Sequence, residues 1–157
     1  MADENKIQSA NKVFQCLCDS LESKGWKFYK DAERLVVHFG VTGKEITTQL
    51  IFFIDADREL VRLLAPLKAQ MAENKRIEGA VATCVASSGL PNGNFDYDLK
   101  KGSIVFRLGS SYKGRELNGD VFHYMISYAF AMVEQYHNRF IALNDGTINI
   151  ADFIDNK

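Results

Sequence analysis

From Trp26 to Ala65 the apolar residues recur at every second position, whereas the residues before Trp26 have helical spacing. This change of period limits the possible folds. Apolar and polar residues alternate there in four short segments, which is the pattern of half-buried β-strands. The connections between them hold three or four mostly polar residues, too few for the crossover that parallel strands need. The sequence therefore predicts an antiparallel meander with strands over 26–30, 35–41, 46–54 and 60–65.

A second alternating pair lies further along the chain. Phe95 to Leu99 and Ile104 to Leu108 flank the turn Lys100-Lys101-Gly102, which predicts a hairpin. Pro66 has no N–H to donate to a strand ladder, so we expect it to mark the end of the fourth strand or an edge of the sheet.

Helical spacing of apolar residues appears in three segments, over 7–21, 73–88 and 119–140. Gly25 and Gly89 follow the first two as stop signals. A short last element is expected around 148–154. The predicted fold is α+β, an antiparallel sheet (meander plus hairpin) covered by three helices in the order α-β-β-β-β-α-β-β-α. With 157 residues the chain fits a single domain over 1–157.

The periodic patterns also predict which side chains form the core. On the second helix they place Ile77, Ala80, Val81, Cys84 and Val85 on the inward side. The residues expected to be buried across the whole chain are Phe14, Leu17, Trp26, Val37, Phe39, Leu50, Phe52, Val81, Phe95, Phe106 and Phe122.

Charge and composition exclude several classes of partner. Nineteen basic and twenty acidic residues give a formal net charge of −1, without the positive excess that nucleic acid or an anionic membrane selects. The N-terminal residues are polar and acidic, unlike a signal peptide, and the most apolar stretch, 121–133, is too short to span a bilayer. We expect a cytoplasmic protein that binds neither nucleic acid nor membrane.

No motif in the sequence predicts a cofactor, a metal or a catalytic centre. Cys16, Cys18 and Cys84 lack zinc-ligand spacing, and an odd cysteine count in such a chain favours free thiols. Gly109 to Glu116 has the glycine spacing of a phosphate loop but lacks its Lys and hydroxyl residue. The pairs Asp55/Asp57 and Asp96/Asp98 sit in or beside turns, and the three histidines stand near no nucleophile motif.

Surplus hydrophobicity is the strongest functional signal. The third helix carries an apolar arc of roughly 200°, wider than the little over 100° that one sheet face covers. On the third strand, Ile51 and Phe53 lie opposite the expected core face, where a one-sided sheet would have polar residues. Either helices cover both sheet faces, or this surface is buried in a dimer or partner interface. The candidate partner-binding residues are Ile51, Phe53, Tyr128, Phe130 and Met132.

The chain resembles the YbjN-type family of bacterial sensory transduction regulators, whose fold is similar to that of class I type III secretion chaperones. The resemblance rests on Gly25-Trp26, Ala65-Pro66, the segment 73–76 (ENKR), the segment 93–98 (GNFDYD) with Gly102 and 104–107 (IVFR), and the long helix from Asp120. It implies a small, non-enzymatic, dimeric protein without catalytic residues. Secretion chaperones use this architecture to hold extended segments of other proteins.

Two functional hypotheses follow. The first is a non-enzymatic cytoplasmic interaction or regulatory module, chaperone-like and homodimeric, that contacts itself and a client protein. The second is a small-ligand-binding module or enzyme with a pocket near the loop 109–118.

Overall fold

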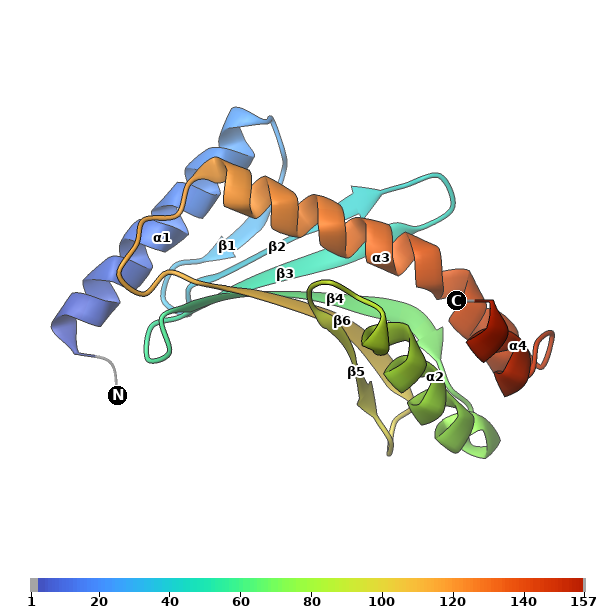
Figure 1. Cartoon of the computed structure of the whole chain (residues 1–157). Coiled ribbons are helices and arrows are strands. Elements are labelled where there is room, and N and C mark those ends of the chain that lie inside the picture. The colour runs from blue at the N-terminus through green and yellow to red at the C-terminus, as the bar shows by residue number, and fades with distance from the viewer. Residues whose placement is uncertain (1–2, 157) are drawn as a thin grey trace.

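The computed structural model describes residues 3–156 and has the predicted α+β order, and the short last element expected around 148–154 is a fourth helix (Figure 1). The elements are α1 (Glu4–Ser23), β1 (Tyr29–Asp31), β2 (Val36–Thr42), β3 (Thr47–Asp55), β4 (Leu60–Gln70), a 3₁₀ turn (Glu73–Lys75), α2 (Arg76–Ser88), β5 (Asn94–Asp98), β6 (Ser103–Ser111), α3 (Gly119–Asp145) and α4 (Ile150–Asp155). The predicted antiparallel meander and hairpin are confirmed.

The strands form one six-stranded antiparallel sheet in the order β1-β2-β3-β4-β6-β5. The hairpin joins the meander through β6, so β5 is an edge strand. Helix α3 packs against β3, β4 and β6, α1 packs against β3 and α3, and α2 packs against β5. In Figure 1, α1 and α3 lie on the same side of the sheet. Within residues 3–156 no helix covers the opposite face, so the sheet has one packed and one open face.

An aromatic cluster forms the centre of the core between α3 and the sheet. The ring of Phe52 lies 6.3 Å from that of Phe39 and 6.2 Å, edge to face, from that of Phe122. Such pairs add to the stabilisation that burial provides. The burial predictions are confirmed for Phe14, Leu17, Val37, Phe39, Leu50, Phe52, Phe95, Phe106 and Phe122, while Trp26 is half-buried and Val81 is exposed.

Of the two predictions for Pro66, a strand end is wrong, whereas a position at an edge of the pairing agrees with the structure, because the β3–β4 ladder ends at Leu64. β4 is a central strand and continues through Pro66 to Gln70. The ladder between β4 and β6 shifts register between Pro66 and Gln70. Pro66 itself still pairs with Val105 on β6, but it lies beyond the last β3–β4 pair, so the N–H that proline lacks is not needed for a bond to β3.

The predicted inward side of α2 is also wrong. Its buried residues are the small ones, Gly79, Ala82, Thr83 and Ala86, whereas Ile77 and Val81 are 71% and 41% exposed and Cys84 is exposed. The reason is close approach: a Cβ atom on Gly79 would lie 2.5 Å from Met71 Cγ and 2.6 Å from the Tyr97 hydroxyl. Only a face of small residues fits that close to the sheet, so the larger apolar residues point outward.

A pair of substitutions tests this orientation of α2. We expect Ala82→Leu to destabilise the protein by about 1 to 3 kcal/mol, because extra methylenes have no room in the packed contact. Val81→Ser, one residue away on the exposed face, should change the free energy of unfolding of a single chain, measured at low protein concentration, by less than about 0.5 kcal/mol. Urea denaturation measures both, and a larger loss for Val81→Ser would restore the orientation that the sequence predicts.

Candidate functional site

The open face of the sheet carries more apolar surface than a solvated face requires. Ile51 and Phe53 on β3 are half-buried there, as are Val36 on β2 and Leu64 on β4. These side chains point away from α1 and α3, because their strand neighbours Val37, Leu50, Phe52 and Leu63 fill the packed side. A contiguous apolar group on a helix-free face is a feature of protein interfaces.

Strand register arranges this face in rows that change from apolar to basic. In one row Val36 pairs with Phe53, and Phe53 pairs with Arg62. In the next row Ile51 pairs with Leu64, and Leu64 pairs with Arg107 on β6. Directly opposed side chains in a sheet lie about 5 Å apart, so each row is one continuous surface. The apolar end therefore lies on β2 and β3 and the basic end on β4 and β6.

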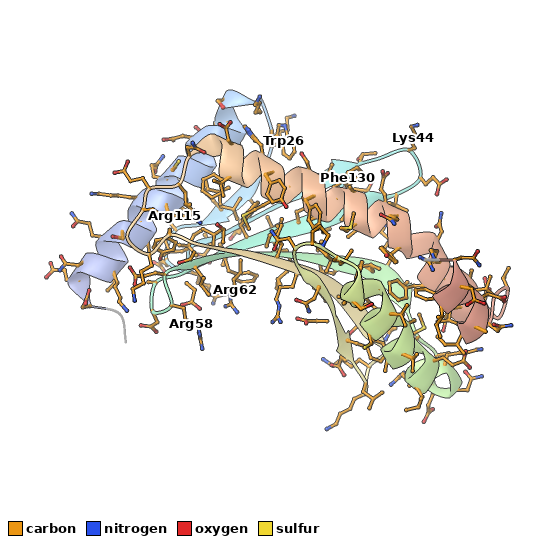
Figure 2. All side chains as sticks on the ribbon, viewed as in Figure 1. Trp26, Lys44, Arg58, Arg62, Arg115 and Phe130 are labelled. Carbon is orange, nitrogen blue, oxygen red and sulfur yellow. The ribbon has the colours of Figure 1, made fainter. Side chains whose placement is uncertain are left out.

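A hollow of about 330 Å³ lies at the basic end of these rows. Its lining includes Arg58, Arg62, Arg107, Gly93, Asn94 and Gly109 and no acidic side chain; we call it the arginine hollow. Figure 2 shows Arg58 and Arg62 projecting from the side of the sheet opposite to α1 and α3. Gly109 pairs with Arg62, and a Cβ atom added at Gly109 would meet only Val61 O, at 3.6 Å. The missing side chain leaves space beside the guanidinium group.

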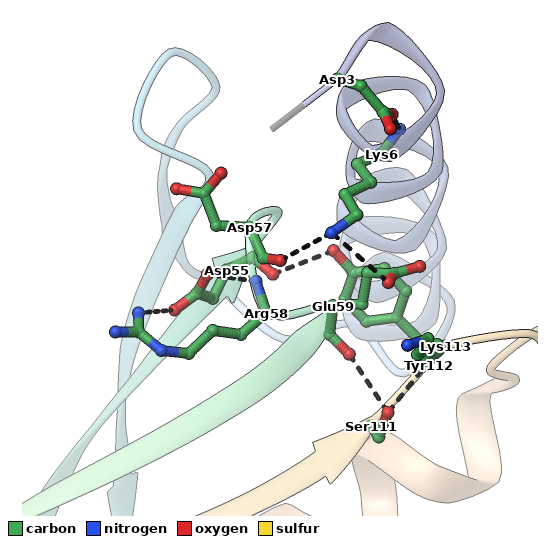
Figure 3. Close-up of polar contacts among 9 residues, drawn as sticks. All are labelled: Asp3, Lys6, Asp55, Asp57, Arg58, Glu59, Ser111, Tyr112 and Lys113. Atoms are coloured by element: carbon green, nitrogen blue, oxygen red, sulfur yellow. Dashed lines mark hydrogen bonds and ion pairs between the residues drawn. The ribbon is translucent and has the colours of Figure 1, made fainter. Parts of the chain in front are cut away.

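The turn between β3 and β4 holds Arg58, which lines the hollow, and Figure 3 shows the polar contacts of this turn. Asp55 Oδ1 accepts a hydrogen bond from Arg58 N at 3.0 Å, and Oδ2 accepts one from Arg58 Nη1 at 2.9 Å. Burial alone would raise the pKa of Asp55, but these bonds and the charges of Arg58 and Arg62 outweigh burial and lower the pKa. Lys6 Nζ on α1 donates to Asp57 O at 3.0 Å and so ties the turn to the first helix.

This turn should make stability depend on pH. Because the folded-state pKa of Asp55 is lowered, its contribution is present above the unfolded-state value near 3.9 and is lost as pH falls through the folded-state value. We expect Asp55→Asn to lower the free energy of unfolding by about 1 kcal/mol at neutral pH. The difference from wild type should shrink as the pH approaches 3 and below, and a difference independent of pH would contradict the assigned role.

The predicted partner-binding residues of α3 contact their own chain. Tyr128 stacks on Tyr124 at 5.7 Å and lies 6.0 Å from the ring of Phe106, and Met132 packs against the core. Phe130 lies against the turn between β2 and β3, where its ring fills the space that a Cβ atom on Gly43 would need. All three are half-buried. Much of the apolar arc of α3 is therefore used inside the chain, by the sheet and by α1, α2 and α4.

Two surfaces were missed by sequence reasoning. The first is the exposed apolar face of α2, formed by Ile77, Val81 and Cys84, which helical spacing alone assigns to the core. The second is the arginine hollow. A signal for it existed, since Arg62 and Arg107 occupy outward positions between buried strand residues, but their convergence depends on β4 pairing with β6.

The loop 109–118 does border a groove, as the second hypothesis expects. The groove has a volume of about 620 Å³ between α1 and this loop, and its lining includes Lys12, Cys16, Tyr112, Arg115 and Glu116. Burial, with Asp19 and Glu116, raises the pKa of the Cys16 thiol, which donates to Leu117 O at 3.3 Å. Burial, with Glu59 and Asp55, raises the pKa of Tyr112 to about 12. Neither group is activated as a nucleophile or a general base.

The remaining candidate chemistry does not assemble within residues 3–156. His123 Nε2 lies 3.3 Å from Ser20 Oγ, and no third group that could orient this histidine contacts it. Burial lowers the pKa of His137, whose Nδ1 has no hydrogen-bond partner there. Asp96 Oδ2 pairs with Arg107 Nη1 at 3.2 Å. No group of three or more His, Cys, Asp or Glu side chains in this range could hold a metal ion.

Comparison with known proteins identifies the fold. One chain of the crystal structure of the ExsC–ExsE complex aligns with 82% of this chain and 93% of its own length, at a TM-score of 0.56 and 13% identity. One chain of the HopA1–SchA chaperone–effector complex aligns with 85% of this chain and 95% of its own length, at 0.53 and 13%. The fold is that of the type III secretion chaperones. The second of these structures is a complex of a chaperone with its effector.

No protein-family model matches the chain, and no curated protein is similar to it in sequence. The chaperone-like part of the predicted resemblance is thus confirmed, while the YbjN-type family stays a prediction. Between residues 3 and 156 no helix combines the length and apolar character needed to cross a bilayer.

Proposed function

We propose that the protein is a non-enzymatic, chaperone-like module that binds an extended segment of a client protein on the open face of its sheet. The observation that carries this proposal is the helix-free face with Ile51 and Phe53 half-buried at its apolar end. The fold similarity to SchA, a chaperone seen with its effector, supports the same class of function. Low identity limits that support to the fold, so the surface carries the argument.

We place the protein in the bacterial cytoplasm as part of the same proposal, and we carry the YbjN-type family forward with it. The resemblance to bacterial sensory transduction regulators supports this location. An enzymatic function at the groove beside the loop 109–118 has weaker support, because burial raises the pKa values of both Cys16 and Tyr112 in its lining.

Affinity capture with matched variants tests the client-binding proposal. The double variant Ile51→Asp/Phe53→Asp should lose a protein that the wild type retains from its native cytoplasm, by at least about tenfold in quantitative mass spectrometry, because a charge in a desolvated contact lies unpaired. The control Ile7→Asp/Ile141→Asp adds the same charge at two exposed apolar residues of α1 and α3, on the other side of the sheet, and should retain that protein. Equal capture by all three proteins would refute the proposed surface, provided circular dichroism shows each to be folded.

We also propose that the protein is a homodimer and that α2 supplies the contact. Ile77, Val81 and Cys84 follow one another at four- and three-residue spacing, so they form one stripe on the outer side of α2. Two copies related by a twofold axis can bury this stripe against itself, which removes the most exposed large apolar side chain of the described chain from water.

Sedimentation equilibrium tests the dimer. At micromolar concentration we expect a mass near twice 17.7 kDa for the wild type and near 17.7 kDa for Ile77→Asp/Val81→Asp. Tyr128→Asp and Phe53→Asp, measured separately, report on the α3 and sheet surfaces that the sequence predicts. Dissociation by either of these, but not by the α2 variant, would move the interface, and a monomeric wild type would remove the dimer altogether.

A further inference from the structure

The guanidinium group of Arg62 is only partly satisfied by its own chain. Its nearest carboxylate oxygen is Asp55 Oδ2, 3.6 Å from Nη2, which is beyond normal hydrogen-bond distance. Its Nε is buried and has no hydrogen-bond partner within residues 3–156. Arginine has five donors in a planar fork that matches a carboxylate, so an arginine with this few partners on a binding surface is suited to an anionic ligand.

The charges around the hollow also favour an anionic ligand. Arg58, Arg62 and Arg107 carry three positive charges, and the two carboxylates paired with them, Asp55 and Asp96, leave an excess of one positive charge. Neither carboxylate is among the lining residues, whose charged members are the three arginines. A hollow of about 330 Å³ admits one side chain and not a folded domain.

The apolar side chains beside the hollow indicate which class of anionic ligand fits this face. The strip from Val36, Ile51 and Phe53 runs directly into the arginine hollow across β4. A nucleic acid would place further phosphates over this strip and near Asp55 and Asp96, and the chain as a whole has net charge −1. A polypeptide offers both parts at once, apolar side chains for the strip and a carboxylate for the hollow.

We propose that the arginine hollow binds an Asp or Glu side chain of an extended client segment whose neighbouring apolar side chains lie on Ile51 and Phe53. This inference rests on the proposed function and adds the chemistry of the client. The hollow begins one strand from β3, at Arg62, and reaches two strands from it, at Arg107, which is roughly 5 to 10 Å from Ile51 and Phe53. Same-side residues of an extended chain repeat every 7 Å or so, so the acidic residue should follow or precede a large apolar residue by about two positions.

Synthetic peptides of about twelve residues, long enough to cross the sheet, test the inference. Each has two leucines separated by one serine, and then glutamate, glutamine or lysine at the same later position. Fluorescence anisotropy should give the glutamate peptide about tenfold tighter binding to the wild type than the glutamine peptide, with the lysine peptide weakest.

Variants assign that preference to the hollow. Arg62→Gln/Arg107→Gln should bind the glutamate and glutamine peptides equally, with the glutamine peptide's affinity unchanged from wild type. The control Arg34→Gln/Lys113→Gln removes the same charge at exposed sites outside the hollow and should keep the preference. If the double variant does not fold, Arg107→Gln alone replaces it, because the Arg107 side chain is half-exposed. This single variant should reduce the preference for the glutamate peptide.

Several results would overturn the inference. They are a glutamate preference that survives Arg62→Gln/Arg107→Gln, no binding of any peptide at millimolar concentration, or tighter arginine-dependent binding of a single-stranded oligothymidylate of matched length. Failure here is separable from failure of the proposed function. Suppose that Ile51→Asp/Phe53→Asp abolishes capture of a client but Arg62→Gln/Arg107→Gln does not change it. That result would support the binding face and contradict its preference for an acidic residue.

Discussion

Phe52→Ala should lower the free energy of unfolding by about 3 to 5 kcal/mol, the largest effect expected of any single core truncation considered for this protein. Phe52 on β3 is completely buried. It pairs with Val37 on β2 and Leu63 on β4, and its ring lies beside those of Phe39 and Phe122. Its removal leaves a cavity between the sheet and α3, because neighbours from three strands and a helix cannot all collapse into it. Urea denaturation with an unchanged m-value would measure the loss.

The adjacent phenylalanine supplies a matched control. Phe53 has the same side chain on the same strand but points to the open face and is only half-buried. Phe53→Ala should therefore cost less than about 2 kcal/mol, since part of its area is in water already. A loss below about 1 kcal/mol for Phe52→Ala, or a larger loss for Phe53→Ala, would mean that the packed and open faces are exchanged.

Gly102→Ala should cost about 2 to 4 kcal/mol, more than its left-handed backbone alone explains. Gly102 has φ of +73°, and a Cβ atom there would lie 2.2 Å from Met71 O. That carbonyl accepts from Arg76 Nε at 3.0 Å, and Met71 N donates to Gly102 O at 2.8 Å. Relief of the clash must therefore break the junction between the end of β4, the start of α2 and the β5–β6 turn.

Gly146→Ala separates the cost of the left-handed backbone from the cost of the clash with Met71. Gly146 ends α3 with φ of +83°, and a Cβ atom there would meet nothing within 4 Å. We expect a loss of about 1 kcal/mol from backbone strain alone. Equal losses for the two variants in thermal or urea denaturation would show that the contact with Met71 has no energetic weight.

Much of the fold was predictable because local chemistry and tertiary structure agree. Asp3 accepts from Lys6 N at the start of α1, and Gly25, Gly89 and Gly146 stand at helix ends. Alternation from Val36 to Ile54 placed Val37, Leu50 and Phe52 on one face, as found. The antiparallel order needed only short connections, which are visible in the sequence.

The predictions failed where two elements approach unusually closely or where a strand pairs with a distant one. On α2, large apolar residues predict the inward face, but the distance to Tyr97 and Met71 admits only Gly79, Ala82 and Ala86. At Pro66 the missing donor predicts a strand end, but β4 continues because it still pairs with the distant β6 there, after its ladder with β3 has ended at Leu64. Neither distance nor register is encoded in the local pattern.

The sequence by itself determined the α+β class, the strand order within the meander and the surplus of apolar residues at Ile51 and Phe53. Only the tertiary structure decided that α1 and α3 share one side of the sheet, that Ile77 and Val81 face outward, and that Arg58, Arg62 and Arg107 surround one hollow. The physical reason is that the two kinds of information act over different distances along the chain. Periodicity and turn chemistry act over a few residues, whereas a surface is made by strands that pair across more than forty residues, as Arg62 does with Gly109.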